Sequence, residues 1–250
     1  MMLDENNVTQ SGVASSSGQT DRGLVRRVNE DAYLDAPEKG LWVVADGMGG
    51  HDAGDVASRM IVESLRSTPL DGSLAARMDQ IEDAVEQVNQ HLLSRGYHDD
   101  GRKHIIGSTI AVLVAESRQI GAVLWAGDSR VYRLRGDTLV QLSTDHSQVE
   151  TYIRQGIITR EQARSHPERN IITRAVGSQD ELYLEADVCE FSPGDRYLLC
   201  SDGLTRHIED DEISRMLADG TPQVVCRNLI NLTLERGAKD NVTVVVVEIN

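Results

Sequence analysis

The 250-residue sequence predicts an α+β protein, because stretches with helical periodicity and stretches of short β-rich runs occupy separate parts of the chain. Apolar residues recur at helical spacing over 53–65 and again over 78–92. Between 105 and 142 the pattern changes to short β-rich runs that Gly, Ser and Asp separate. Gly136-Asp137 fits a two-residue hairpin turn, so this region is expected to form an antiparallel meander.

The remaining segments follow in chain order. Residues 1–9 are polar and aperiodic, which predicts a disordered tail, and 10–20 predict a strand or a linker. Residues 145–180 predict short helices and loops, with a capping box at Thr159 and Gln162. Because no domain linker or repeat follows the tail, we expect a single domain over 10–250. Further strands are expected at 182–190, 195–201 and 242–249, and further helices at about 209–218 and 221–237.

Composition excludes several classes of function. A net charge of −15 argues against binding to nucleic acid or to an anionic membrane, since both need basic patches. Cys189, Cys200 and Cys226 show neither zinc spacing nor a disulfide framework, which is typical of a reducing compartment. The start of the chain is polar, and no apolar stretch is long enough to span a bilayer. We therefore expect a cytoplasmic protein.

The stretch 42–50 is the first candidate for a functional site. An apolar run ends at Asp46, and three glycines follow within four residues. This pattern predicts a strand that delivers one carboxylate to a bare turn, where glycines allow close backbone approach and positive φ. Taken alone, the stretch is equally consistent with an ordinary Asp-Gly turn before a helix.

Three further aspartates lie beside apolar strands. Asp128 and Asp202 follow such strands, and Asp240 precedes one. If the strand ends converge, four carboxylates meet and repel one another, so that either one pKa rises or a cation neutralises them. All-oxygen ligands favour Mg²⁺ or Mn²⁺, which would support hydrolysis, and Arg26 could hold a phosphate.

The chain also carries an ordered set of motifs that covers most of the sequence beyond residue 15. With this set it resembles the metal-dependent protein phosphatases of the protein phosphatase 2C (PPM) family, in their compact bacterial form. The matching stretches are Gly-Leu-Val-Arg-Arg-Val-Asn-Glu-Asp at 23–31, Val-Ala-Asp-Gly-Met-Gly-Gly-His at 44–51, Gly-Ser-Thr at 107–109, Gly-Asp-Ser-Arg at 127–130, Asp-His-Ser at 145–147, His-Pro-Glu-Arg-Asn-Ile-Ile-Thr-Arg-Ala-Val-Gly at 166–177, Ser-Asp-Gly-Leu at 201–204 and Lys-Asp-Asn-Val-Thr at 239–243.

The resemblance implies a four-layer αββα sandwich, in which two antiparallel sheets pack face to face between helices. It implies that Asp46 bridges two metal ions, that the Gly47 carbonyl binds the second, and that Asp202 and Asp240 bind the first. Asp128 would join Asp202 at a weaker third site. By the same resemblance Glu30 and Asp31 would mainly orient metal-bound waters. Direct binding of a metal ion by these two residues is the alternative. Arg26 matches the phosphate-binding arginine, and 145–180 the flap beside the site.

One position departs from the animal members of the family. They carry a histidine directly after the Asp-Gly pair, as the proposed general acid, and this chain has Met48 there, as its bacterial relatives usually do. His51 is a candidate proton donor, but a structural role at the start of a helix is at least as consistent with its place.

The expected function is that of a protein-serine/threonine phosphatase, in which a metal-bridging water attacks the phosphorus directly. Its partners would be phosphorylated proteins and a Ser/Thr kinase, and the chain would act as a monomer. A non-catalytic phosphoprotein-binding module and a phosphatase of small metabolites are the alternatives on the same fold.

Overall fold

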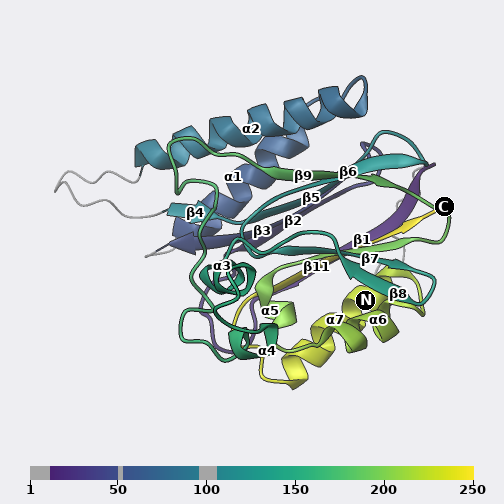
Figure 1. The fold of residues 1–250 in the computed structure, drawn as a ribbon. Coiled ribbons are helices and arrows are strands. Elements are labelled where there is room, and N and C mark those ends of the chain that lie inside the picture. The colour runs from purple at the N-terminus through teal and green to yellow at the C-terminus, as the bar shows by residue number, and fades with distance from the viewer. Residues whose placement is uncertain (1–11, 50–52, 96–105) are drawn as a thin grey trace, which may run out of the picture.

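The computed structural model describes residues 12–49, 53–95 and 106–250, whose strands form two antiparallel β-sheets (Figure 1). The β11 sheet has the order β1-β11-β10-β7-β8, and the β3 sheet has the order β2-β3-β5-β6-β9, with β4 paired to β3. The strands are β1 (Ala14–Asp21), β2 (Asp31–Ala36), β3 (Leu41–Gly49), β4 (Ile106–Ser108), β5 (Ile110–Ala115), β6 (Ile120–Ala126), β7 (Arg130–Arg135), β8 (Thr138–Gln141), β9 (Glu185–Glu190), β10 (Arg196–Cys200) and β11 (Val242–Ile249).

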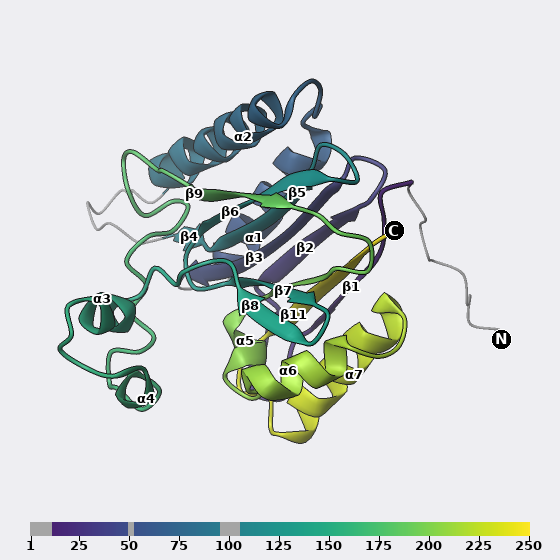
Figure 2. The same cartoon turned by 45° about the vertical axis from the view of Figure 1, so that its right-hand side comes forward.

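Helices cover the outer face of each sheet. Helices α1 and α2 lie on the β3 sheet, α6 and α7 lie on the β11 sheet, and α3 and α4 project to one side (Figures 1 and 2). The predicted four-layer αββα sandwich is therefore confirmed. The helices are α1 (Ala53–Ser67), α2 (Leu74–Arg95), α3 (Gln148–Arg154), α4 (Arg160–Ala163), α5 (Asp202–Thr205), α6 (Asp210–Leu217) and α7 (Pro222–Glu235). None of the helices within the described ranges is long and apolar enough to cross a membrane.

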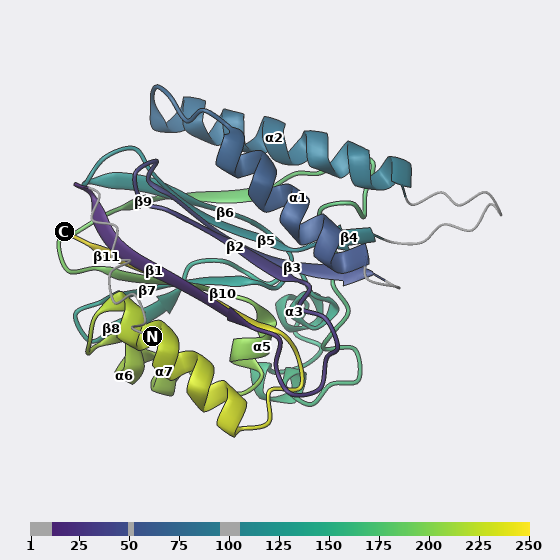
Figure 3. The same cartoon turned by 180° about the vertical axis from the view of Figure 1, so that it is seen from behind.

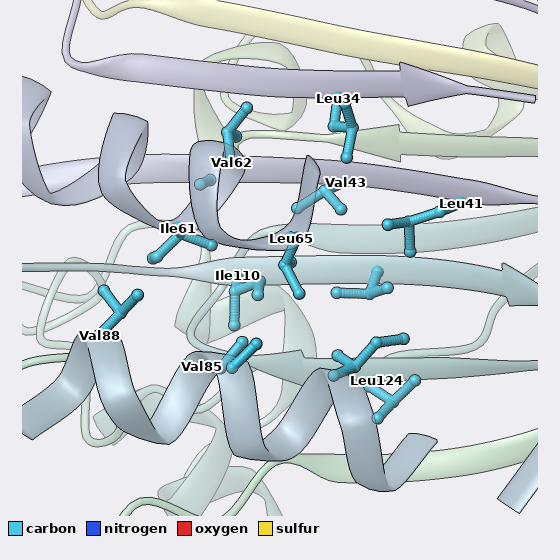
Figure 4. Packing of buried hydrophobic residues seen from close by; sticks show 14 of the residues in the cluster. Leu34, Leu41, Val43, Ile61, Val62, Leu65, Val85, Val88, Ile110 and Leu124 are labelled. Atoms are coloured by element: carbon cyan, nitrogen blue, oxygen red, sulfur yellow. The ribbon is translucent and has the colours of Figure 1, made fainter. Parts of the chain in front are cut away.

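Strand β3 shows how the layers are held together. Leu41, Val43 and Ala45 face the helices, whereas Trp42 and Val44 face the other sheet. Side chains alternate along a strand, so β3 is apolar on both faces because both are covered. Each fully buried aliphatic side chain contributes roughly 1.5–3 kcal/mol. Figure 4 shows α1 and α2 packing on this sheet through residues that include Ile61, Leu65, Val85, Ile110 and Leu124.

The predicted meander over 105–142 is wrong in one respect. Strands β5 and β6 pair in the β3 sheet, but β7 and β8 pair in the β11 sheet. The chain crosses between the sheets at Gly127–Ser129, where Gly127 has a φ of 115°. A Cβ on Gly127 would lie 2.6 Å from the Cβ of Thr109. A periodicity of two identifies strands but not their neighbours, so the crossing could not be predicted.

Strand β3 also differs from the prediction, because it continues through Asp46 to Gly49 and pairs with β4. Gly47 and Gly49 are therefore extended and do not have the positive φ that the glycines suggested. Gly47 is required for close approach: a Cβ there would lie 2.0 Å from the Gly54 carbonyl oxygen. Helix α5, which starts at Asp202, was not predicted. The predicted disordered tail and His51 lie outside the described residues.

Candidate metal centre

Carboxylates from both sheets line one cavity at the end of the sandwich opposite the C-terminus, the end at which β3 stops and α5 follows β10 (Figures 1 and 3). A cavity of about 190 Å³ opens there, and three of the four predicted aspartates, Asp46, Asp202 and Asp240, line it. Asp128 is buried; its charge helps to raise the pKa of Asp46, and the charge of Asp202 helps to raise the pKa of Asp128. The convergence that the sequence could only assume is therefore present. Arg26, Glu30, Gly47, Met48, Gly49, Ile172, Arg206 and Asn241 complete the lining.

Strand β3 holds Asp46 through its backbone. The Asp46 N–H donates to Thr109 Oγ1 at 3.1 Å, and the Asp46 carbonyl accepts from Ser108 Oγ at 3.0 Å. Thr109 Oγ1 is in turn 2.6 Å from Ser129 Oγ, beside Asp128. The hydroxyl groups of the Gly-Ser-Thr motif thus link the strand that carries Asp46 to the crossing that carries Asp128.

Asp31 ties the two sheets together at the site. It lies on β2 of the β3 sheet, and its Oδ2 accepts from Ser201 Oγ at 2.8 Å, directly after β10, and from Thr243 Oγ1 at 2.7 Å, on β11. Its Oδ1 is buried and has no hydrogen-bond partner. Burial is the main cause that raises the pKa of Asp31 to about 7, and the two hydroxyl donors oppose it.

Asn241 anchors the loop that carries Arg26. Its Nδ2 donates to the carbonyl oxygens of Arg22 at 2.8 Å and Val28 at 3.0 Å, and its Oδ1 accepts from the Glu30 N–H at 2.9 Å. The Glu30 carbonyl then accepts from the Gly47 N–H at 3.0 Å. One amide therefore sets the loop position relative to β3 and β11. Asn241 belongs to the Lys-Asp-Asn-Val-Thr motif, but the sequence alone did not predict a role for it.

Two arginines engage the carboxylates of the cavity. Arg26 makes a bidentate pair with Asp240, at 2.8 Å from Nε to Oδ1 and 2.9 Å from Nη2 to Oδ2. Arg206 bonds to Asp240 at 2.8 Å and also to Asp202. Arg26 was predicted at this site, whereas Arg206 was missed. Its spacing of four residues after Asp202, typical of an ion pair on a helix, was the available signal.

Asp128 lies on the crossing between the sheets, and the segment 145–180 buttresses it. The Gly127 N–H donates to His146 Nδ1 at 3.1 Å, so the other ring nitrogen carries the proton and donates to Glu185 Oε2, also at 3.1 Å. Arg130 pairs bidentately with Asp145, from Nε to Oδ1 at 2.9 Å and from Nη2 to Oδ2 at 2.7 Å. Asp128 Oδ1 has no partner, and burial, followed by the charge of Asp202, raises the pKa of Asp128 to about 8.

The donor set fits a divalent cation. Burial, followed by the charges of neighbouring aspartates, raises the pKa of Asp46 well above its usual value. Burial also raises the pKa of Asp202 to about 6, against the opposing charge of Arg206. Unpaired oxygens on Asp31 and Asp128 add acceptors that water or a metal would satisfy. Within the described ranges, no group of three His, Cys, Asp or Glu side chains is already placed to hold a metal ion. Instead, arginines bind the carboxylate oxygens of Asp202 and Asp240.

These raised pKa values predict that the metal-free protein loses stability as the pH rises. Asp202, Asp31 and Asp128 titrate near 6, 7 and 8 in the folded state, against about 3.9 when unfolded. Folding therefore favours their protonated forms, so this contribution is fully present below about pH 4 and is lost progressively as the pH rises to about 8. Thermal unfolding in a chelator should show a lower Tm at about pH 8 than at about pH 5.5. Asp128→Asn should make the Tm depend less on pH. A wild-type Tm that rises from about pH 5.5 to about pH 8 would contradict the prediction.

Asn241→Ala is expected to lower both stability and substrate affinity. The change leaves the Glu30 N–H and two carbonyl groups without their partner, at a cost of about 1–3 kcal/mol for each group that stays buried. It also loosens the loop that carries Arg26, so KM for a phosphorylated substrate should rise more than kcat falls. Urea unfolding and steady-state kinetics measure both effects. Asn89→Ala, which removes a similar buried anchor to Gly177 and Gln179, should lower stability and leave KM unchanged.

Metal-dependent phosphatases are the class of protein in which such a sandwich carries carboxylates and an arginine at one end of its sheets. The chain belongs to the protein phosphatase 2C family, whose model matches residues 25–231. The family that the motifs predicted is thereby confirmed.

Named bacterial relatives agree with this family. The chain is 37% identical over 236 residues to the serine/threonine protein phosphatase PstP of Mycobacterium tuberculosis, covering 93% of this chain and 44% of that protein. It therefore spans less than half the length of that relative. The serine/threonine phosphatase stp of Listeria innocua is 34% identical, with 93% of this chain and 94% of that protein covered. These names agree with the predicted phosphatase activity.

Solved structures share the fold. The structure of PppA, described as a key regulatory component of T6SS in Pseudomonas aeruginosa, has a TM-score of 0.87 at 42% identity and covers 98% of this chain and 100% of its own. The catalytic domain of PstP in complex with two manganese ions has a TM-score of 0.84 at 33% identity, with 95% and 98% covered. That relative binds Mn²⁺, the metal type that the oxygen donors here favour.

Proposed function

We propose that this chain is a protein-serine/threonine phosphatase that hydrolyses phosphoserine and phosphothreonine in proteins with the help of Mn²⁺ or Mg²⁺. The observation that carries the proposal is the convergence of Asp46, Asp202 and Asp240 on one cavity that Arg26 also lines. Carboxylates gathered in a buried place are stabilised by cations, and an arginine beside them suits a phosphate dianion.

The carboxylates would divide the metal ions as the family pattern implies. Asp46 would bridge two ions, the Gly47 carbonyl would bind the second, and Asp202 and Asp240 would bind the first. Asp128 with Asp202 would take a third. When bound, such ions lower the pKa of a water and offset charge on the phosphoryl oxygens. The hydroxyl groups on Asp31 and the strand pairing of β3 keep the donors in place before any ion binds.

Arg26 would hold the phosphate of the substrate. Its side chain is 49% exposed at the cavity, so its guanidinium can reach a ligand there, while Asn241 holds its loop. A bidentate contact with two phosphoryl oxygens would fix the phosphorus within the cavity. Glu30, which lines the same cavity, would orient a water, and Asp31 behind it would do the same through its unpaired Oδ1.

The proton for the leaving group is not provided by the residue after Asp46-Gly47, because Met48 stands there. None of the described residues that line the cavity is a histidine. His51 stays the candidate donor. A general acid matters for a serine alkoxide, by about 10²–10⁴-fold, and little for an aryl phosphate. We expect His51→Ala to leave p-nitrophenyl phosphate hydrolysis within about threefold of wild type. A loss of several orders of magnitude on this substrate would rule that out.

The proposed function is tested with purified protein on phosphoserine and phosphothreonine peptides, with Mn²⁺, with Mg²⁺ and with a chelator. The expected result is hydrolysis with either metal and none with the chelator, without a covalent phosphoenzyme in acid-quenched samples. Metal-independent hydrolysis would overturn the proposal. Titrating Mn²⁺ and Mg²⁺ separately also tests the number of ions and which of them supports the higher rate.

Two alternatives predict different results in the same experiment. A non-catalytic phosphoprotein-binding module would bind the peptides without cleaving them. A metabolite phosphatase would hydrolyse small phosphate esters with a far higher kcat/KM than peptides. The gathering of the predicted aspartates at one end of the sandwich favours catalysis over mere binding.

The proposed setting is cytoplasmic signalling opposite a Ser/Thr kinase, with residues 10–250 forming one catalytic domain that acts as a monomer. Pairing of β1 with β11, from Ala14 with Ile249 to Asp21 with Val242, supports one domain. Three buried, unpaired cysteines are typical of a reducing compartment. A net charge of −15 supports neither nucleic acid nor an anionic membrane as a partner.

A further inference from the structure

Arg206 occupies a special place at the carboxylate centre. It is the C-terminal cap of α5, and its N–H donates to the Asp202 carbonyl at 3.0 Å, which fixes its backbone one turn beyond Asp202. From there the guanidinium bonds to Asp202 Oδ2 through Nη2 and to Asp240 Oδ2 through Nη1, the latter at 2.8 Å. It thus bridges two carboxylates, one shortly after the end of β10 and the other shortly before the start of β11.

The oxygens that Arg206 binds are those that a metal ion would need. Asp202 and Asp240 are the two side chains that the family pattern assigns to the first ion. A guanidinium bonded to both Oδ2 atoms occupies the position between the two carboxylates, so a cation that took this position would have to displace it. Among the described residues no carboxylate trio stands ready for a metal. Arg206 and a cation therefore compete for the position between Asp202 and Asp240.

Arg26 and Arg206 differ in what they can do when a metal binds. Arg26 contacts Asp240 alone, and its loop is held by Asn241. Arg206 contacts both carboxylates, and its side chain is 36% exposed, so a displaced guanidinium can turn into solvent at the mouth of the cavity. Of these two arginines, Arg206 is the one that bridges Asp202 and Asp240.

We propose that the Arg206 guanidinium is an internal counter-cation of the carboxylate centre, which holds Asp202 and Asp240 together in the metal-free protein and is displaced when a divalent cation binds them. The inference rests on the proposed function in that these aspartates bind metal. It follows that Arg206 stabilises the metal-free fold against carboxylate repulsion and lowers the affinity of the first metal site. Arg206 is a positioning residue and takes no part in the hydrolysis itself.

The test measures metal affinity and metal-free stability rather than activity. Arg206→Met keeps the length of the side chain and removes its charge, and Arg206→Lys keeps the charge but not the planar fork that bridges two carboxylates. Arg236→Met is the matched control, because Arg236 is also 36% exposed and pairs with Glu212 away from the cavity. Calorimetric titration with Mn²⁺ gives Kd, and thermal unfolding in a chelator gives the metal-free Tm.

We expect Arg206→Met to bind Mn²⁺ at least about tenfold more tightly, the factor that one charge-assisted hydrogen bond contributes, and to unfold at a lower temperature without metal. Arg206→Lys should lie between it and wild type, and Arg236→Met should bind Mn²⁺ like wild type. An affinity of Arg206→Met that is unchanged or weaker would overturn the proposal. So would an affinity of Arg206→Lys equal to that of Arg206→Met, because the positive charge at this position would then have no effect.

A second measurement uses the wild-type protein and does not depend on the variants folding. The guanidinium ¹H–¹⁵N signal of Arg206, identified by its absence in Arg206→Lys, or by elimination against the other arginines if that variant does not fold, is followed during Mg²⁺ titration. Displacement predicts that it moves to the position of solvent-exposed arginines at saturation, and a signal that stays unchanged overturns the proposal. Failure of the proposed function would appear separately, as hydrolysis without metal or no hydrolysis by a protein that binds Mn²⁺.

Discussion

Asp46→Asn should reduce Mn²⁺-dependent hydrolysis of p-nitrophenyl phosphate by at least about 10³-fold in kcat/KM, since metal ions supply several kcal/mol of transition-state stabilisation and Asp46 would bridge two of them. The amide keeps the size of the side chain but removes the negative charge. Asp46 lies inside β3 and is held by Ser108 and Thr109 through its backbone, so the strand should persist.

The loss can be separated from unfolding. Burial and neighbouring aspartates raise the pKa of Asp46, so neutralising it removes repulsion, and the Tm of the chelated protein should stay the same or rise near neutral pH. Asp187→Asn, on the exposed strand β9, should retain full activity. Activity of Asp46→Asn within about tenfold of wild type, or wild-type activity that survives chelation, would refute the assignment of Asp46.

Gly203→Ala should lower both the stability of the protein and its affinity for Mn²⁺. An added Cβ would lie 1.9 Å from the Asn241 carbonyl oxygen and 3.3 Å from the Cα of Val242. Because both contacts are backbone, the clash must move α5 away from the start of β11, at a cost of at least about 1–3 kcal/mol. That movement separates Asp202 from Asp240, the pair expected to bind one ion. Thermal unfolding and calorimetric Mn²⁺ titration measure the two effects.

Gly194→Ala provides the contrast. Gly194 has a φ of 85°, with no atom within 4 Å of an added Cβ, and its N–H bonds to Ile249 at the far end of β11. Alanine there should cost about 1 kcal/mol from backbone strain and leave Mn²⁺ affinity unchanged. If Gly203→Ala bound Mn²⁺ as wild type does, the close packing of α5 on β11 would not control the site.

Local pattern was sufficient for most of the secondary structure. Helices α1 and α2 follow from apolar residues at helical spacing, and β5, β6 and β11 follow from continuous apolar runs. Helix α7 follows from Pro222 at its start and Gly237 after its end. The capping box at Thr159 and Gln162 was also predicted and is present. The errors lie at the site, where β3 continues past Asp46 and α5 begins at Asp202. Tertiary contacts override local propensity at such places.

By itself, the sequence predicted which residues would carry the chemistry. Four aspartates beside apolar strands and Arg26 within an ordered motif set identified the family and the acidic site. Residue type, strand period and motif order are local properties that can be read along the chain.

Only the tertiary structure decided how these residues meet. Asp31 bonds to Thr243 across 212 positions of sequence, Asn241 reaches back to Arg22 across 219, and the chain changes sheets beside Asp128. Arg206 became part of the site only because α5 directs it between Asp202 and Asp240. Such contacts depend on how two sheets pack, and packing between distant segments leaves no periodic trace in a single sequence.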